Sequence, residues 1–240
     1  MKRLILIRHG QSLWNAENKF TGWVDSSLSE LGIEEAKKAG KLIKEYDVDI
    51  GSAFTSFLSR AIDTLNLLLK ELDRSDFIVN KTWYLNERHY GSLTGLNKEE
   101  TKQKIGESLF LKYRRSWDIA PPRMEKNDKN ISLFGSLNET IPGDKVPNTE
   151  SLKDTYNRVI KYYNETIIDI LKKNNVIIIT AHGNSLRALC KYLFKISDED
   201  INNLEIPTGN PMTINFTDSL RIDNAIYLDK ERAKPIINLD

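Results

Sequence analysis

The sequence predicts an α/β fold of three layers, in which a mostly parallel central sheet is flanked by helices and carries a long inserted lid-like loop region. Buried strands are expected at residues 4–7 and 176–180, because each is a short apolar run that ends at a turn-forming segment. An amphipathic helix is expected at residues 29–46, where apolar side chains recur every three or four positions. Strands that alternate with such helices are typical of parallel sheets.

The first half of the chain is predicted to follow the order β-α-β-α-β. Residues 12–15 open a short helix after the first strand, and a loop leads to the helix at residues 29–46. This helix is expected to bury Ile33, Ala36, Ala39 and Ile43 and to expose Glu34, Glu35, Lys37, Lys38 and Lys41. A strand at residues 50–55, a leucine-rich helix that ends near Leu72 and a strand at residues 77–83 complete this half.

Two later segments lack a clear helix or strand pattern. Residues 85–98 are polar and interrupted by glycines directly after a strand, which favours an active-site loop. Residues 106–147 show little sustained periodicity, and insertions of this length are usually lids or binding loops. We therefore expect one domain, residues 1–240, with the insertion at 106–147 lying over the active site.

Regular structure is expected again after the insertion. Ser151 and Asp154 form a capping-box-like start to a helix at residues 151–172. The remaining predicted elements are the strand at 176–180, a helix that ends at Phe194, and strands at 212–216 and 225–228.

Composition and charge exclude several classes of protein. The 35 basic and 34 acidic residues leave a formal net charge of +1, so bulk nucleic-acid binding gains no support. The single cysteine, Cys190, rules out an intramolecular disulfide framework and a multi-cysteine metal site, and it favours a reducing compartment. No apolar run approaches the length of a signal peptide core or a membrane span, so we expect a cytoplasmic protein without membrane association.

Two arginines and two histidines follow predicted strands. Arg8 and His9 end the first strand, Arg60 follows the second, and His182 follows the strand at residues 176–180. Catalytic groups of open α/β sheets gather at the carboxyl ends of strands. Arginine donors match phosphate oxygens and stay charged, so the sequence predicts a pocket for a phosphate dianion.

Within such a pocket, a histidine can attack phosphorus. His9 is the candidate nucleophile if a backbone hydrogen bond holds one ring nitrogen and leaves the other to form a phosphohistidine. His182 would be a cationic donor to the phosphoryl oxygens, and Glu87 the general acid or base for the hydroxyl that gains or loses the phosphoryl group. No metal is expected, because the three histidines lack a ligand spacing such as HExxH, and no GxxxxGK[ST] nucleotide-binding loop is present.

Each of these residues also has an ordinary explanation. A single histidine at a strand end is most often a hydrogen-bonded polar residue without a catalytic role. The other ordinary explanations are an ion pair for Glu87 and Arg88, a solvated surface for Arg114 and Arg115, and surface or packing roles for Lys98 and Tyr90. The joint placement of the histidines and arginines favours catalysis.

Arg8-His9-Gly10 resembles the signature of the histidine phosphatase superfamily, whose members use a phosphohistidine intermediate. Further blocks, in family order over nearly the whole chain, are similar to those of the cofactor-dependent phosphoglycerate mutases. These blocks are Trp14-Asn15, Phe20-Thr21-Gly22-Trp23, Glu87-Arg88-His89-Tyr90-Gly91, Gly95-Leu96-Asn97-Lys98, Arg114-Arg115-Ser116, Glu150-Ser151-Leu152-Lys153-Asp154-Thr155, Ala181-His182-Gly183-Asn184-Ser185 and Ile206-Pro207-Thr208-Gly209-Asn210-Pro211. The chain departs from the pattern at Gln11, Trp117 and residues 212–215.

The resemblance implies a role for each matching residue. Beside His9 and Glu87, the transferred phosphoryl group would be surrounded by Arg8, Asn15, Arg60 and His182, with further polar contacts from Gly10, Gln11, Ser12, Gly183 and Asn184. The substrate's carboxylate and distal phosphate would be held by Thr21, Gly22, Arg88, His89, Tyr90, Lys98, Arg114 and Arg115. The distal group must be gripped without being cleaved, which requires a second anion site.

The activity implied by the resemblance is the interconversion of 3-phosphoglycerate and 2-phosphoglycerate, with 2,3-bisphosphoglycerate as the priming phosphoryl donor and no metal. A homodimer or homotetramer is implied in the same way. Two alternatives stay open: a phosphatase of the same superfamily, in which water accepts the phosphoryl group, and a phospho-ligand binding module without catalysis. Lys98, Arg114 and Arg115 disfavour the phosphatase, and the presence of both His9 and Glu87 disfavours the binding module.

Overall fold

The computed structural model describes residues 2–75, 77–125, 134 and 141–238. Within these residues, one six-stranded sheet has the strand order β3-β2-β4-β1-β5-β6. The strands β1 to β4 are parallel, whereas β5 runs antiparallel to β1 and β6 antiparallel to β5. The strands are β1 (Lys2–Arg8), β2 (Ser52–Thr55), β3 (Val79–Lys81), β4 (Val176–Ala181), β5 (Met212–Phe216) and β6 (Ile222–Tyr227).

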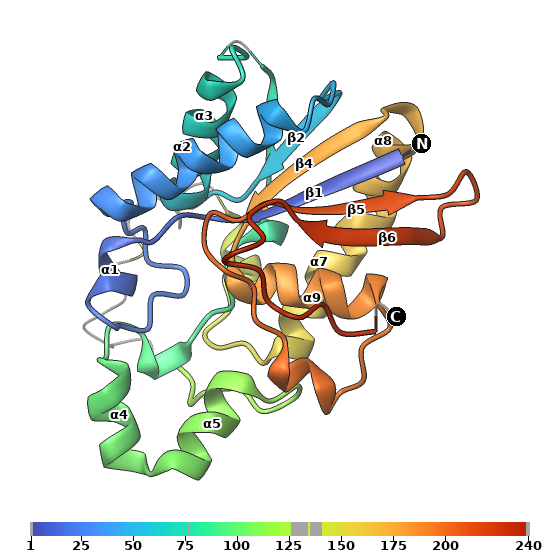
Figure 1. Cartoon of the computed structure of the whole chain (residues 1–240). Helices are drawn as coiled ribbons and strands as arrows, with labels where there is room; N and C mark the ends of the chain where they lie inside the picture. The colour runs from blue at the N-terminus through green and yellow to red at the C-terminus, as the bar shows by residue number, and fades with distance from the viewer. Residues whose placement is uncertain (1, 76, 126–133, 135–140, 239–240) are drawn as a thin grey trace.

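Helices cover both faces of this sheet, and α4 (Lys98–Ile105) and α5 (Glu107–Arg115) lie away from it (Figure 1). The α-helices are α1 (Leu13–Ala16), α2 (Glu30–Glu45), α3 (Ser59–Glu71), α4 (Lys98–Ile105), α5 (Glu107–Arg115), α7 (Leu152–Tyr162), α8 (Ile168–Lys173) and α9 (Gly183–Leu193). A π-helical turn (Tyr163–Ile167) joins α7 to α8, and short 3-10 turns are formed by Trp83–Leu85, Gly91–Leu93, Gly143–Lys145 and Asp200–Asn203. The predicted α/β class and mostly parallel sheet are confirmed.

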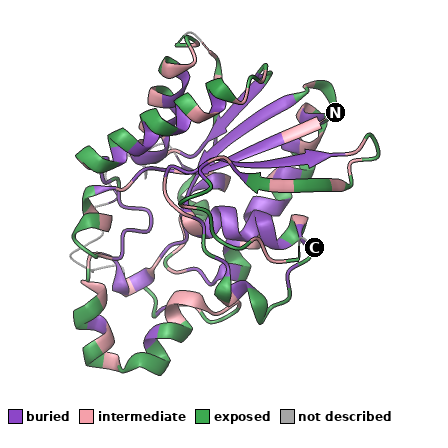
Figure 2. Ribbon diagram, viewed as in Figure 1, coloured by how far each residue is buried: buried purple, intermediate pink, exposed green. Residues whose placement is uncertain are grey.

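The alternation of side chains along β1 produces the layers. Leu4 and Leu6 pack with α7 and α9, whereas Ile5 and Ile7 pack with α2 and α3. All four side chains are essentially without solvent exposure, and Figure 2 shows β1 coloured as buried except near its ends. Burial of one such side chain contributes about 1.5–3 kcal/mol. The sheet is thus covered on both faces, as a parallel sheet requires.

One face of α2 differs from the prediction. Ala36, Ala39 and Ile43 are buried as expected, but Ile33 is 36% exposed and Glu35 is only 8% exposed. The reason is a close approach of the turn after β1 to the start of α2: a Cβ on Gly32 would lie 2.0 Å from the carbonyl oxygen of Gln11. The turn therefore covers this side of the helix. Glu35 is buried because its carboxylate binds the amide of Gln11 in this turn as well as Thr208 and Arg232.

Part of the predicted loop region at residues 106–147 is helical. The helix α5 occupies Glu107–Arg115 and packs Phe110 against Phe20, with ring centroids 6.1 Å apart. Its apolar contacts are few, which explains why periodicity in the sequence did not indicate it. Residues 126–133 and 135–140 lie outside the described residues, so the lid expected there stays a prediction.

Candidate active site

The strands β1 and β4 end side by side, because Arg8 pairs with Ala181 in their parallel register. The amide of His9 donates to the carbonyl of Ala181 at 2.9 Å, and the ring centroids of His9 and His182 are 4.9 Å apart. On the other side of β4 lies β2, and the hydroxyl oxygen of Ser56, which follows β2, is 2.7 Å from Nε2 of His182. The sheet therefore brings together two histidines that are distant in the sequence.

Two hydrogen bonds define the tautomer of His9. Its Nδ1 lies 2.6 Å from the carbonyl oxygen of Gly10, and its Nε2 lies 3.2 Å from Nε of Arg60. A carbonyl oxygen can only accept and a guanidinium can only donate. The proton therefore resides on Nδ1, and Nε2 carries the lone pair that a nucleophile needs.

Burial, followed by the charges of Arg60 and Arg8, lowers the pKa of His9 well below its ordinary value. The ring is therefore neutral at neutral pH. Burial also lowers the pKa of Arg60, to about 10, so this guanidinium keeps its charge. The result is an uncharged imidazole beside a fixed cation, which suits attack on a phosphoryl group that the cation also binds.

His182 has no solvent exposure, and its burial is the main reason why its pKa lies well below the ordinary value. The charge of Arg60 acts in the same direction. A nearby opposite charge favours the charged form of an ionisable group. A phosphoryl dianion bound against His182 would raise its pKa, so the cationic role expected of this residue depends on the anion itself.

The carboxylate of Glu87 is held at the edge of the same site. Its Oε1 accepts hydrogen bonds from the amides of Arg88 at 2.8 Å and Asn184 at 3.1 Å. Its backbone carbonyl accepts from Nε1 of Trp23 and from Nη2 of Arg158. One carboxylate oxygen is therefore fixed by backbone donors, while the residue stays in contact with the cavity described below.

Arg158 binds the backbone of the segment that carries Glu87. Its guanidinium also donates to the carbonyls of Tyr84 at 2.7 Å and Asn86 at 2.9 Å, and it pairs with both carboxylate oxygens of Glu150. Arg158 is 9% exposed and Glu150 is 4% exposed. A buried bidentate pair of this kind fixes the position of the backbone that it contacts, and here that backbone carries Glu87.

A cavity of about 240 Å³ opens at these strand ends. Its wall has a strong excess of positive charge: eight basic and two acidic side chains of described residues line it. The basic residues are Arg8, Lys19, Arg60, Lys98, Arg114, Arg115, Arg187 and Lys234, and the acidic ones are Glu87 and Glu205. Such a wall concentrates small anions that carry several charges.

Most of the residues expected at the site line this cavity. They are Arg8, His9, Asn15, Thr21, Gly22, Arg60, Glu87, Tyr90, Lys98, Arg114, Arg115, Gly183 and Asn184. Six expected residues are not in its wall: Gly10, Gln11, Ser12, Arg88, His89 and His182. His182 nevertheless lies against His9, which is part of the wall.

The other five residues outside the wall have structural contacts. Gly10 lies against the start of α2, and the amide of Gln11 donates to Glu35. Ser12 caps α1, and Arg88 lies over the ring of Tyr90 and donates to the carbonyl of Arg114. His89 lies 5.0 Å from the ring of Phe134, and its burial lowers its pKa to about 4.

The cavity wall also contains four charged residues that the sequence did not indicate: Lys19, Arg187, Glu205 and Lys234. Only Arg187 had a usable signal, because it follows Asn184 by three positions on a helix and so lies on the same side. Its Nη1 donates to Oδ1 of Asn184 at 2.8 Å, and Nδ2 of Asn184 donates to the hydroxyl of Tyr90 at 3.0 Å. Arg187 thus determines the orientation of this amide.

Arg187→Met is expected to raise the dissociation constant of 3-phosphoglycerate, the ligand that the sequence resemblance implies, about tenfold, because it removes one cation of the cavity and frees the Asn184 amide to rotate. Burial lowers the pKa of Arg187 to about 9, so the side chain is charged at neutral pH. Titration calorimetry at low and high salt checks this. Equal affinities for Arg187→Met and the unchanged protein would remove Arg187 from the binding site.

Two features are absent from the described residues. No group of three or more histidine, cysteine, aspartate or glutamate side chains is placed to hold a metal ion there. Nor does that part of the chain contain a helix that is both long and apolar enough to cross a membrane.

Known proteins resemble this chain over nearly its whole length. Residues 4–131 and 131–221 match the sequence profile of the histidine phosphatase superfamily (branch 1). The 2,3-bisphosphoglycerate-dependent phosphoglycerate mutase of Pelagibacter ubique (strain HTCC1062) is 50% identical over 238 residues, which cover 99% of both chains. The protein of the same name from Porphyromonas gingivalis (strain ATCC 33277) is 48% identical, with 99% of this chain and 96% of that one covered.

A solved structure described as mycobacterial hydrolase 1 has the same fold. It matches with a TM-score of 0.70 and 22% identity, and the match covers 93% of this chain and 97% of that chain.

Proposed function

Because the chain belongs to the 2,3-bisphosphoglycerate-dependent phosphoglycerate mutases of the histidine phosphatase superfamily, we infer that it interconverts 3-phosphoglycerate and 2-phosphoglycerate through a phosphohistidine at His9. The enzyme is an isomerase of glycolysis and gluconeogenesis. The observation that best supports His9 as the phosphoryl carrier is its neutral ring, with Nε2 directed at Arg60 in a basic cavity.

Each residue near His9 has a role that follows from its contacts. Arg8 and Arg60 would bind oxygens of the phosphoryl group, and Arg60 would hold it in line with Nε2. His182 would become charged as the dianion arrives and would donate to it. The parallel pairing of β1 with β4 places the ring centroids of His9 and His182 4.9 Å apart, which is close enough for both side chains to contact one phosphoryl group.

Glu87 would move the proton of the substrate hydroxyl. The amides of Arg88 and Asn184 occupy its Oε1, so Oε2 is the atom left for proton transfer. In one direction it would protonate the oxygen that leaves phosphorus, and in the other it would accept the proton of the attacking hydroxyl.

A second group of cations distinguishes a mutase from a phosphatase. Lys98, Arg114 and Arg115 come from α4 and α5, away from the strand ends, yet line the same cavity as His9. Burial lowers the pKa values of Lys98 and Arg114, as expected for cations withdrawn from water. They would hold the carboxylate and distal phosphate, so that a bound phosphoglycerate, rather than water, accepts the phosphoryl group.

The cavity suits 2,3-bisphosphoglycerate as well, since eight basic side chains face a ligand with two phosphates and a carboxylate. This molecule would supply the priming phosphoryl group. From the resemblance to this family we further propose that no metal takes part and that the enzyme is a homodimer or homotetramer. From the composition of the chain we propose that it is cytoplasmic and binds neither nucleic acid nor membranes.

Turnover of 3-phosphoglycerate, followed with and without added 2,3-bisphosphoglycerate, tests this function. We expect activity that depends on the bisphosphate and is unchanged by a chelator of divalent cations. Release of inorganic phosphate as the main product would instead identify a phosphatase, and a requirement for a divalent metal would exclude the mechanism described here.

A further inference from the structure

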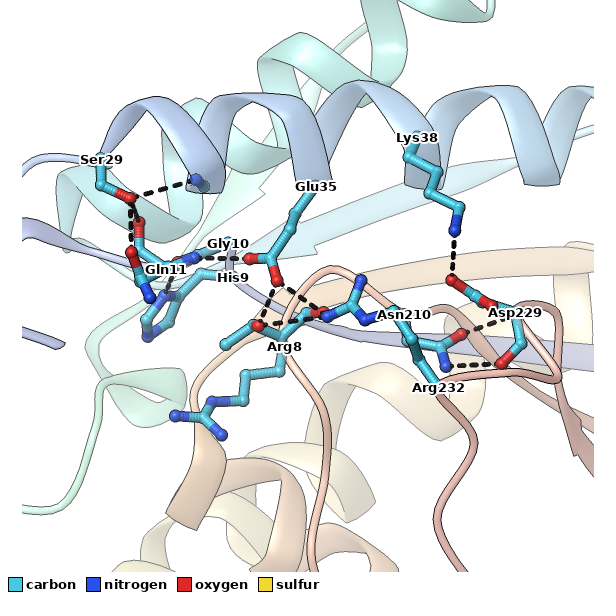
Figure 3. A network of polar contacts seen from close by, with 12 residues as sticks. Arg8, His9, Gly10, Gln11, Ser29, Glu35, Lys38, Asn210, Asp229 and Arg232 are labelled. Atoms are coloured by element: carbon cyan, nitrogen blue, oxygen red, sulfur yellow. Dashed lines mark hydrogen bonds and ion pairs between the residues drawn. The ribbon is translucent and has the colours of Figure 1, made fainter. Parts of the chain in front are cut away.

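The carboxylate of Glu35 joins three segments that are far apart in the sequence (Figure 3). Its Oε2 accepts from the amide of Gln11 at 2.8 Å, in the turn that follows His9. Its Oε1 accepts from the hydroxyl of Thr208 and from Nη2 of Arg232, both at 2.7 Å. One buried side chain on α2 therefore binds three segments: residues 9–12, called the nucleophile turn below, the segment before β5, and residues 229–238, called the C-terminal segment.

Close packing around Glu35 leaves these segments little freedom. A Cβ on Gly209 would lie 2.5 Å from Cβ of Glu35, and Gly209 has a φ of +57°, which favours glycine. The amide of Gly209 donates to the carbonyl of Arg8 at 2.8 Å. The carboxylate thus lies beside the end of β1, and Glu35 is not among the residues that line the cavity.

Arg232 connects this contact to the cavity. Besides binding Glu35, its Nη2 donates to the carbonyl of Thr208 at 2.6 Å. Two residues later in the chain, Lys234 lines the cavity, and its charge contributes to the lowered pKa of Glu205, chiefly caused by Arg115. The position of Lys234 therefore depends on where Arg232 is held.

We propose that Glu35 is a positioning residue that fixes the C-terminal segment relative to the nucleophile turn, so that Lys234 and His9 face the same anionic substrate. The kinetic consequences rest on the proposed function, whereas the structural coupling does not. Two separate effects follow. Loss of the Arg232 contact should weaken substrate binding, and loss of Glu35 itself should also disturb the turn that carries His9.

The chain offers a matched control. Lys38, one turn after Glu35 on α2, forms an ion pair of 2.6 Å with Asp229, three residues before Arg232. This pair joins the same helix to the same segment but contacts neither the nucleophile turn nor the cavity wall. Lys38→Met therefore reports what loss of a link between α2 and the C-terminal segment does by itself.

Hydrogen exchange tests the coupling without any assay of activity. In Glu35→Gln, which keeps the size of the side chain but has one oxygen acceptor fewer, we expect amide exchange to rise about tenfold or more in residues 9–12 and in residues 230–238. In Arg232→Gln only residues 230–238 should change, and in Lys38→Met residues 9–12 should keep their protection. The proposal would be overturned if the amides of residues 9–12 exchanged no faster in Glu35→Gln than in the unchanged protein. It would also be overturned if those amides lost their protection in Lys38→Met.

Kinetics test the functional part. Arg232→Gln is expected to raise KM for 3-phosphoglycerate about tenfold with little change in kcat, and Glu35→Gln to raise KM and also lower kcat. The double variant should raise KM by less than the product of the two single effects, because both changes remove the contact between Glu35 and Arg232. Additive effects, or an unchanged KM in Arg232→Gln, would contradict the role of Lys234. If the unchanged protein had no mutase activity, the proposed function would be wrong. The hydrogen-exchange results would still show whether Glu35 links the nucleophile turn to the C-terminal segment.

Discussion

His9→Ala is expected to lower mutase turnover by roughly four orders of magnitude or more, because it removes Nε2, the atom that we propose carries the phosphoryl group between donor and acceptor. The variant should also lose protein-bound label after incubation with labelled 2,3-bisphosphoglycerate. In the unchanged protein this label should be acid-labile and alkali-stable. Both quantities are measured on the same preparation, by turnover and by the label that remains after precipitation in alkali.

His9→Asn distinguishes the loss of the phosphoryl-accepting atom from a disturbance of the fold around residue 9. Its side-chain amide can still donate to the carbonyl of Gly10, which accepts from His9 at 2.6 Å, but it cannot form a phosphohistidine. We expect it to unfold at nearly the temperature of the unchanged protein and to be as inactive as His9→Ala. Undiminished label in either variant would place the phosphoryl group on another residue and refute the assignment.

The second large effect is expected for Glu87→Gln, which should lower kcat by roughly 10² to 10⁴. The amide oxygen of glutamine can still accept from Arg88 and Asn184, so the loop should keep its position. The substitution removes the ability to exchange a proton with the substrate hydroxyl, together with one negative charge of the cavity wall. The value of kcat and single-turnover labelling of His9, each followed between pH 6 and 9, measure this loss.

Glu205→Gln is the matched control, since Glu205 lines the same cavity but forms an ion pair of 2.8 Å with Arg115 at its rim. Its effect on kcat should be small, because a partly exposed ion pair contributes little. Comparable losses of kcat in the two variants would show that Glu87 acts through the charge of the cavity and not as an acid or base.

Sequence patterns predicted the architecture well where one periodicity applied to a whole element. The buried strands, the helix that contains Ala36, Ala39 and Ile43, and the capping box of Ser151 with Asp154 are all confirmed. The exposure of Ile33 was missed, because it depends on the close approach of Gly32 to a turn that is distant in the pattern. Tertiary contacts of this kind leave no local signal.

The residues of the cavity also fall into those that a local sequence pattern indicates and those that only tertiary contacts place there. Residues at strand ends, such as Arg8 and His9, were predicted because the sheet determines where such ends meet. Lys234 was not, because it lies in the polar segment after β6, where the sequence shows no motif. The role of Glu35 was missed for a related reason: an acidic residue on a helix is ordinarily exposed, and only its three partners explain its burial.

The strand order has a consequence for how the chain is made. The first strand, β1, lies between β4 and β5, which are encoded in the last third of the sequence. During synthesis its apolar residues leave the ribosome long before either neighbour exists, and such an unpaired edge is prone to aggregate. Pairings over this sequence distance also fold slowly. The strand that leads to His9 is thus translated long before either of its neighbours, and its edges stay unpaired until both have followed.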